Sequence, residues 1–183
     1  VFIAMPGVVP GRSQDGRTHI DQALGRGAQA VLVEAEGWSA DQFNVNLGVY
    51  LNVPILPVKG LRALSGYLAA RYYDEPSRKL LTVGVTGTNG KTSCTHWIAQ
   101  GMTQSGRRGG VLGTVGSGFP GTDAFTRSGL TTPEAVALHT AIHQLIADGA
   151  QMVALEASSI GLAQGRLDQD ARGRVEKHLK TCE

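Results

Sequence analysis

Short apolar runs alternate along the chain with segments in which apolar residues recur every three or four positions. The apolar runs predict buried strands at residues 1–4, 30–34, 53–58, 80–86, 110–116 and 151–157. The spacing of three and four predicts helices at residues 17–27, 61–73, 92–106 and 131–149. Strands that alternate with helices are typical of parallel sheets covered by helices, so we expect an α/β fold.

Two of the expected helices have an apolar side that we expect to be buried. In the helix at 61–73, this side consists of Leu61, Leu64, Leu68 and Tyr72. In the helix at 92–106, the side expected to pack on a sheet consists of Cys94, Trp97, Ile98, Gly101 and Met102. Gly106 is expected to end that helix, because glycine readily adopts the left-handed conformation found there.

The expected helix at 131–149 has recognisable ends. Thr131 or Thr132 is expected to cap its start, and Pro133 suits its first turn. Gly149 is expected to end it. The buried strand that follows finishes in a carboxylate, so the second half of the chain alternates strand, helix, strand, helix and strand, as expected of a parallel sheet.

A polar stretch with a proline, "DEPSRK", separates two strand–helix patterns that each look self-sufficient. Such stretches are typical of linkers, so we predict a linker at residues 75–79. The expected organisation is a small N-terminal α/β domain at residues 1–74 and a second, parallel-sheet domain at residues 80–168. Residues 169–183 are highly charged and are expected to form a tail outside the second domain.

Charge and cysteine content narrow the class of protein. Lysine and arginine total 17 against 15 acidic residues, a net charge of +2, and the basic residues are scattered. This argues against a nucleic-acid or membrane surface. Cys94 and Cys182 lie far apart without a CxxC motif, which favours a reduced, cytoplasmic protein without a zinc site. We also expect no signal peptide, and no apolar run has the length needed to span a bilayer.

The strongest chemical signal is the stretch "GVTGTNGKTS" at residues 84–93, between an expected strand and an expected helix. Glycines let backbone N–H groups turn inward, and a helix N-terminus adds about half of a positive charge, so such a turn binds phosphate. Lys91 can reach terminal phosphates, and the Thr92 hydroxyl can bind Mg²⁺. The standard P-loop spacing is not met, because Val85 stands where its first glycine would be. A glycine turn before an ordinary helix is the less favoured alternative.

Other polar residues leave alternatives open on position alone. Glu156 follows a buried strand, where it either holds Mg²⁺ opposite Thr92 or is simply solvated. Ser158 is consistent with the start of a turn, as Arg166 is with a surface charge. His139 and His143 are spaced by four on a helix, but no HExxH arrangement accompanies them, so we expect two half-exposed histidines.

Three stretches together resemble one family. "GTNGKT" within residues 87–92 is similar to the ATP-binding loop of the Mur ligases, the ATP-dependent ligases of peptidoglycan precursor synthesis. "LTTPEAVALH" (130–139) and "LEASSIGLAQGRLD" (155–168) resemble segments of the MurE type of that family. The opening of the chain is similar to the N-terminal, UDP-binding domain of the same type. The resemblance covers residues 1–168 and implies that residues 80–168 form a P-loop-type ATP-binding domain.

The resemblance also implies roles for individual residues. The residues implied to bind ATP are Gly87, Thr88, Asn89, Gly90, Lys91, Thr92 and Ser93. The residues implied to bind the UDP-MurNAc-dipeptide are Thr131, Thr132, Ser158, Gln164 and Arg166. Thr92 and Glu156 are the implied Mg²⁺ ligands, and Lys91 is the implied catalytic residue. The implied reaction is activation of the D-Glu carboxylate as an acyl phosphate and its capture by an amino acid, with meso-diaminopimelate the expected one.

The sequence also departs from the family pattern. Leu130 stands where an asparagine precedes Thr-Thr-Pro, and Ile160 stands where a histidine often follows Ser-Ser. The match stops after Asp168, and no C-terminal domain that would bind the amino acid follows. We therefore expect an incomplete, monomeric ligase that does not complete the reaction alone. The alternatives are MurF, a folylpolyglutamate synthase, a nucleotide-binding module without ligase activity, and a fragment that folds poorly.

Overall fold

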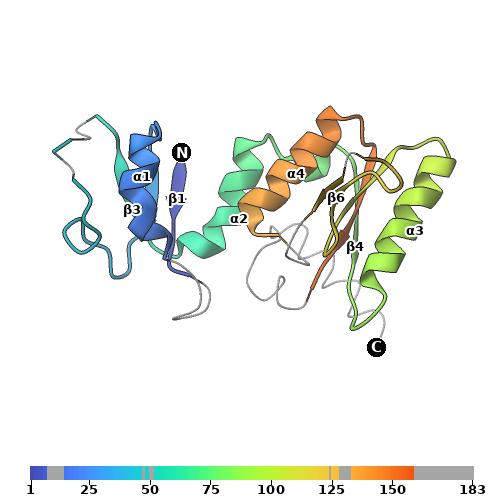
Figure 1. Ribbon diagram of the computed structural model, residues 1–183, viewed down its shortest axis with the longest axis horizontal. Helices are drawn as coiled ribbons and strands as arrows, with labels where there is room; N and C mark the ends of the chain where they lie inside the picture. Colours follow the sequence, from blue (N-terminus) through green and yellow to red (C-terminus); the bar gives the residue numbers. More distant parts are fainter. Residues whose placement is uncertain (8–14, 47, 50–51, 124, 128–132, 159–183) are drawn as a thin grey trace. The chain divides into compact units, whose positions relative to one another are not determined.

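A computed structural model describes residues 1–7, 15–46, 48–49, 52–123, 125–127 and 133–158 (Figure 1). The chain divides into two compact units, Val1–Leu64 and Ser65–Glu183. Among the described residues, no helix combines the length and the apolar character that a membrane span requires. The α/β class expected from the sequence is confirmed in both units.

The first unit is a parallel three-stranded sheet with one helical connection. Its strands are β1 (Phe2–Ala4), β2 (Val31–Glu34) and β3 (Ile55–Val58), in the order β1-β2-β3. The prolines of the third strand predicted an edge position, and β3 does lie at an edge. The core consists of Ala4, Ile20, Leu24, Val31, Val33 and Val45.

The helix expected at residues 17–27 is shorter and begins differently. A 3-10 turn, η1 (Gly16–His19), precedes the α-helix α1 (Ile20–Gly25). Asp15 caps this turn by accepting a hydrogen bond from the backbone N–H of Arg17 at 2.9 Å. The cap fixes the tight geometry of the turn, so the regular helix starts only at Ile20.

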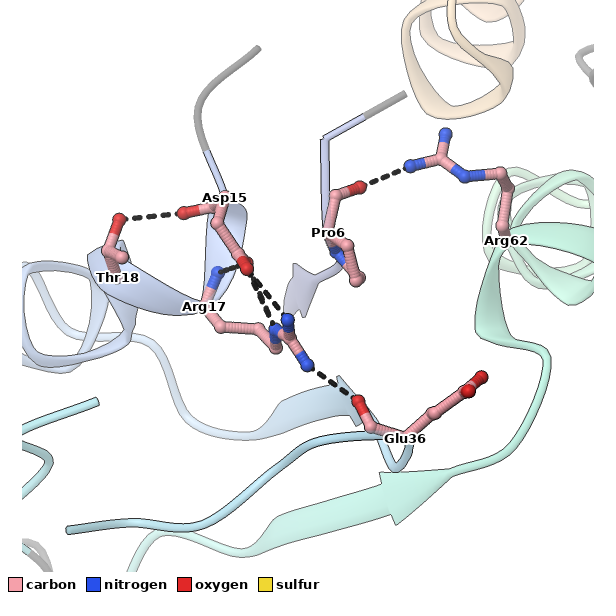
Figure 2. Close-up of polar contacts among 6 residues, drawn as sticks. All are labelled: Pro6, Asp15, Arg17, Thr18, Glu36 and Arg62. Carbon is pink, nitrogen blue, oxygen red and sulfur yellow. Dashed lines mark hydrogen bonds and ion pairs between the residues drawn. The ribbon is translucent and has the colours of Figure 1, made fainter. Parts of the chain in front are cut away.

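Arg17 is a buried cation that ties the cap to the next loop (Figure 2). Its guanidinium donates to both carboxylate oxygens of Asp15, from Nε to Oδ1 at 3.0 Å and from Nη2 to Oδ2 at 2.7 Å. Nη1 donates to the carbonyl oxygen of Glu36 at 2.7 Å, and the guanidinium lies 4.6 Å from the ring centroid of Phe43. The hydrogen bond from Arg17 holds the pKa of Asp15 below its usual value.

The second unit contains a five-stranded sheet with helices on its two faces (Figure 1). Its strands are β4 (Leu81–Val85), β5 (Gly109–Leu112), β6 (Gly116–Gly118), β7 (Phe125–Arg127) and β8 (Met152–Glu156), in the order β4-β8-β5-β6-β7. Its helical elements are η2 (Pro76–Arg78), α3 (Lys91–Gln104) and α4 (Ala135–Ala147). The helix α2 (Leu61–Tyr72) begins in the first unit and ends in the second. The 75–79 linker remains a prediction.

The sheet of the second unit is not wholly parallel, which corrects one expectation. β4, β8 and β5 are parallel, but β6 and β7 continue the sheet as antiparallel strands. The strand expected at 110–116 is therefore a strand, a turn and the start of a second strand. Paired backbone hydrogen bonds between Gly113 and Gly116 close the turn, at 2.9 and 3.1 Å.

The faces predicted for α2 and α3 are correct only in part. On α2, Leu61 is buried as predicted, but Leu64 and Tyr72 are 42% and 73% exposed, and the rest of the buried side consists of Ser65, Gly66, Ala69 and Ala70. On α3, Trp97 is 69% exposed, whereas Thr95 and Ala99 are buried. Small side chains mark both buried faces because they let a helix backbone approach its neighbours closely. Hydrophobicity alone does not identify such a face.

The helix α4 ends as expected but starts later. Glu134 is its N-cap, so Pro133 precedes the helix instead of lying in its first turn. Gly149 has φ 89°, and its N–H donates to the carbonyl oxygen of Ile146 at 2.9 Å, which ends the helix. His139 is 1% exposed and not half-exposed, which corrects that expectation. His143 is exposed beside the ring of Tyr73, with centroids 5.2 Å apart.

Candidate functional site

The glycine-rich loop joins the end of β4 to the first residue of α3, as the sequence predicted. Gly87 and Gly90 have φ of 137° and 76°, which only glycine adopts readily. The first backbone hydrogen bond of the helix runs from the N–H of Cys94 to the carbonyl oxygen of Gly90 at 2.9 Å. The N–H groups that precede it in α3 lie at the positive end of the helix dipole. Since residues 87–90 are exposed, these donors form a surface that can bind an anion.

Lys91, the first residue of α3, folds back over this loop. Its ammonium Nζ donates to the carbonyl oxygen of Gly87 at 2.8 Å and to that of Thr88 at 3.3 Å. The positive charge therefore lies directly beside the loop backbone. A polyphosphate that binds the loop would meet this ammonium without any movement of the helix.

Glu156 ends β8 next to the strand that leads into the loop. In the parallel ladder Glu156 pairs with Val85, and the N–H of Ala157 donates to the carbonyl oxygen of Val85 at 2.9 Å. The side chain is 2% exposed, so the solvated alternative is wrong. Its Oε1 accepts a hydrogen bond from the Thr92 hydroxyl at 2.8 Å. Parallel pairing of β4 and β8 thus brings together two residues that the sequence had suggested as partners.

Thr114 completes this cluster, and sequence reasoning missed it. Its backbone N–H donates to Oε1 of Glu156 at 3.0 Å, and its hydroxyl donates to Oε2 at 3.0 Å. Thr114 lies two residues beyond β5, at the same edge of the sheet as the loop and Glu156. A search for polar residues after every strand of the parallel sheet would have found it.

The oxygen atoms of Thr92 and Glu156 fit a small divalent cation. Mg²⁺ prefers hard oxygen ligands, and a hydroxyl group and a carboxylate both supply oxygens of that kind. Oε1 of Glu156 accepts the hydrogen of the Thr92 hydroxyl at 2.8 Å, which leaves the lone pairs of the Thr92 oxygen for a cation next to the carboxylate. Among the described residues, no three His, Cys, Asp or Glu side chains gather as a protein-only metal site would require. A cation here would take its remaining ligands from water or from a bound phosphate.

The structure describes part of the expected substrate site. Ser158 lies two residues beyond β8, at the loop edge of the sheet, and is half-buried. Four other expected substrate-binding residues lie outside the described residues, namely Thr131, Thr132, Gln164 and Arg166. The two departures from the family pattern, Leu130 and Ile160, also lie outside them.

Comparisons with known proteins agree with this geometry. The family profile "Mur ligase middle domain" matches residues 85–175. The chain is 48% identical over 159 residues to the UDP-N-acetylmuramoyl-L-alanyl-D-glutamate–2,6-diaminopimelate ligase of Pseudomonas putida, covering 87% of this chain and 30% of that protein. It is 48% identical over 157 residues to the enzyme of that name from Ralstonia nicotianae, covering 84% of this chain and 28% of the relative.

A solved structure of an enzyme with the same name shares the fold. It aligns with a TM-score of 0.66 and 33% identity, over 90% of this chain and 30% of the solved chain. The chain thus spans about 30% of the length of the relatives that it matches. The family profile, the identity over most of the chain and the common fold show that this chain belongs to the Mur ligase family.

Proposed function

We propose that this chain is part of an ATP-dependent ligase that adds an amino acid to UDP-MurNAc-L-Ala-D-Glu. The observation that carries the proposal is the hydrogen bond of Thr92 with Glu156 at 2.8 Å. Thr92 follows Lys91 at the start of α3, where the glycine loop ends. This arrangement offers backbone donors, an ammonium and hard oxygen ligands for one nucleotide and one cation. The relatives' names supply the substrate and the proposed amino acid, diaminopimelate.

The proposed reaction requires two anions to approach each other. The D-Glu carboxylate attacks the γ-phosphorus of ATP, so that one O–P bond forms, the bond to ADP breaks, and an acyl phosphate results. The amine of the amino acid then attacks the acyl carbon, phosphate leaves, and the amine loses a proton. Lys91 and the N–H groups at the start of α3 would stabilise the phosphate charge.

Thr92 and Glu156 are the residues that would hold Mg²⁺ beside the phosphates. When bound, the cation would neutralise phosphate charge. Glu156 also orients Thr92. The Thr92 hydroxyl donates a hydrogen bond to Oε1, which turns the lone pairs of its oxygen away from the carboxylate. ATP and Mg²⁺ are accordingly the proposed cofactors.

Substrate binding is proposed at the same edge of the second sheet. Ser158 lies at this edge, and Thr131, Thr132, Gln164 and Arg166 are proposed to join it in contacts with the UDP-MurNAc-dipeptide. The first unit is proposed to contribute to binding of the UDP group. Because the proposed co-substrate is ATP, we propose that the protein is cytoplasmic. We further propose that it is a monomer and that its partners are these small molecules, not nucleic acid or membrane.

Calorimetric titration tests the proposal with two ligands on the purified chain. Mg-ATP and UDP-MurNAc-L-Ala-D-Glu are each expected to bind and to raise the melting temperature. Binding of Mg-ATP without any binding of the UDP-MurNAc-dipeptide would favour a nucleotide-binding module of another kind. Failure of Mg-ATP to bind a cooperatively folded chain would contradict the proposed function.

A further inference from the structure

We propose that Thr114 is a positioning residue that orients the Glu156 carboxylate toward the metal–nucleotide complex. The inference rests on the proposed function, since it assumes that Mg-ATP binds beside Glu156. It goes further by assigning a role to a residue outside the glycine loop and outside the sequence motifs. In this role Thr114 contacts neither Mg²⁺ nor ATP and acts only through Glu156.

Thr114 holds the carboxylate at two points. The backbone N–H binds Oε1 and the hydroxyl binds Oε2, both at 3.0 Å. The last torsion of a glutamate side chain has broad preferences, so a single hydrogen bond leaves the carboxylate plane free to turn. One residue that binds both oxygens fixes that plane.

The orientation matters because Oε1 has a second partner. Oε1 accepts the hydrogen of the Thr92 hydroxyl at 2.8 Å, so the plane set by Thr114 determines where that hydroxyl points. The carboxylate therefore connects the turn after β5 with the first turn of α3. If the carboxylate rotates, Thr92 loses the acceptor that directs its lone pairs outward.

Burial makes this arrangement costly to disturb. Glu156 is 2% exposed, and a buried carboxylate requires hydrogen-bond donors in place of water. Gly113 closes the other side, because a Cβ atom at that position would lie 2.1 Å from Oε1. The carboxylate thus has a closely defined position, and Thr114 supplies two of the bonds that define it.

The test separates binding of the metal from binding of the nucleotide. The dissociation constant of ATP is measured by calorimetry in EDTA and in excess Mg²⁺, and their ratio gives the metal enhancement. Thr114→Val removes the hydroxyl and keeps the shape and the backbone N–H, whereas Thr114→Ser keeps the hydroxyl. Thr122→Val is the matched control, because it also removes a threonine hydroxyl, one that donates to a carbonyl oxygen, that of Phe119, at 2.9 Å.

Loss of a residue that orients a metal ligand typically lowers metal affinity about 10–100-fold. Thr114→Val is expected to reduce the metal enhancement about tenfold while the affinity in EDTA stays within twofold of wild type. Thr114→Ser and Thr122→Val are expected to retain the wild-type enhancement within threefold. These results together with unchanged thermal melts would support the positioning role.

Three other results would overturn it. Wild-type enhancement in Thr114→Val would reject the role of Thr114 and leave the proposed function standing. Loss of enhancement only together with a lowered melting temperature would show that Thr114 is structural. Absence of ATP binding by the wild-type chain in Mg²⁺ would reject both the proposed function and the positioning role.

Discussion

Gly113 faces Glu156 at a distance that leaves no room for a side chain. A Cβ atom at position 113 would lie 2.1 Å from Oε1 of Glu156 and 2.6 Å from its Cδ. The carboxylate is buried, and it accepts hydrogen bonds from Thr92 of α3 and from Thr114 in the turn after β5. A side chain at position 113 therefore requires the Glu156 carboxylate to move.

Gly113→Ala is expected to displace Glu156 and to weaken Mg-ATP binding. Forced overpacking of this kind costs about 1–3 kcal/mol of the free energy of unfolding. Gly101→Ala is the matched control, because Gly101 is exposed within α3 and a Cβ atom there meets nothing within 4 Å. Since alanine favours helices over glycine, this control is expected to raise the free energy of unfolding by about 0.5–1 kcal/mol. Urea unfolding measures the free energy of unfolding of both variants. Equal changes in the two variants would contradict the close approach of Gly113 to Glu156.

Lys91→Ala is expected to weaken Mg-ATP binding about 10–100-fold, because hydrogen bonds to charged groups contribute about 1.5–3 kcal/mol. The ammonium lies 2.8 Å from the Gly87 carbonyl oxygen, where a phosphate on the loop would meet it. Lys59→Ala removes an exposed lysine from the first unit and is expected to leave the affinity unchanged. Calorimetry gives both affinities. Equal affinity in Lys91→Ala and wild type would remove the basis for a phosphate site here.

Sequence reasoning succeeded where the signal is local. Apolar runs predicted the positions of β2, β4 and β8, and the loop residues around Lys91 follow from glycine conformation and helix polarity. The end of α4 was predictable because Gly149 adopts a positive φ that other residues disfavour. Each of these features depends on residues close together in the chain.

The misses depend on pairings between distant segments. Thr114 reaches Glu156 only because β8 lies between β4 and β5, and this order is not written in any short stretch of sequence. The buried face of α3 was missed for a related reason. Ala99 is buried where α3 approaches Gly109 of β5, and small residues give no hydrophobic signal.

The close contact of Ala99 with Gly109 predicts that alanine substitutions at Gly109 and at Gly110 differ greatly in their effect on the free energy of unfolding. A Cβ atom at Gly109 would lie 2.5 Å from the Ala99 carbonyl oxygen and 2.9 Å from its Cα, and these backbone atoms cannot move aside without shifting α3. At Gly110 it would lie 3.1 Å from the two Cδ atoms of Leu145, at the flexible end of a side chain.

Gly109→Ala is therefore expected to lower the free energy of unfolding by about 3 kcal/mol or more, beyond the usual range for added methyl groups. Gly110→Ala is expected to cost about 1–2 kcal/mol. Urea unfolding of the two variants provides the comparison. A larger loss for Gly110→Ala than for Gly109→Ala would show that α3 does not pack this closely on β5.

The ion pair between Asp15 and Arg17 predicts how the first unit responds to acid. The hydrogen bond from Arg17 holds the pKa of Asp15 below its usual value of 3.8. A carboxyl group whose pKa is lower in the folded state stabilises that state above its unfolded pKa. This contribution is lost as the pH falls through the folded pKa. The stabilisation is therefore expected to be complete at pH 6, to begin to fall near the usual pKa of 3.8, and to be lost at lower pH as the folded carboxyl group becomes protonated.

Asp15→Asn tests this pH dependence, because it keeps the size of the side chain and removes its charge. At pH 6 the variant is expected to be about 1–3 kcal/mol less stable than wild type, from the loss of hydrogen bonds to a charged group. The difference is expected to shrink as the pH falls below 3.8 and the carboxyl group of wild-type Asp15 becomes protonated. Urea unfolding followed by tryptophan fluorescence is suitable, because Trp38 stacks on Phe43, the ring beneath Arg17, with centroids 5.5 Å apart. Asp41→Asn, at an exposed position of the same unit, is expected to show no such trend. A difference that stays constant as the pH falls from 6 until wild-type Asp15 is protonated would mean that the charge of Asp15 does not stabilise the turn, leaving its neutral hydrogen bonds as the source.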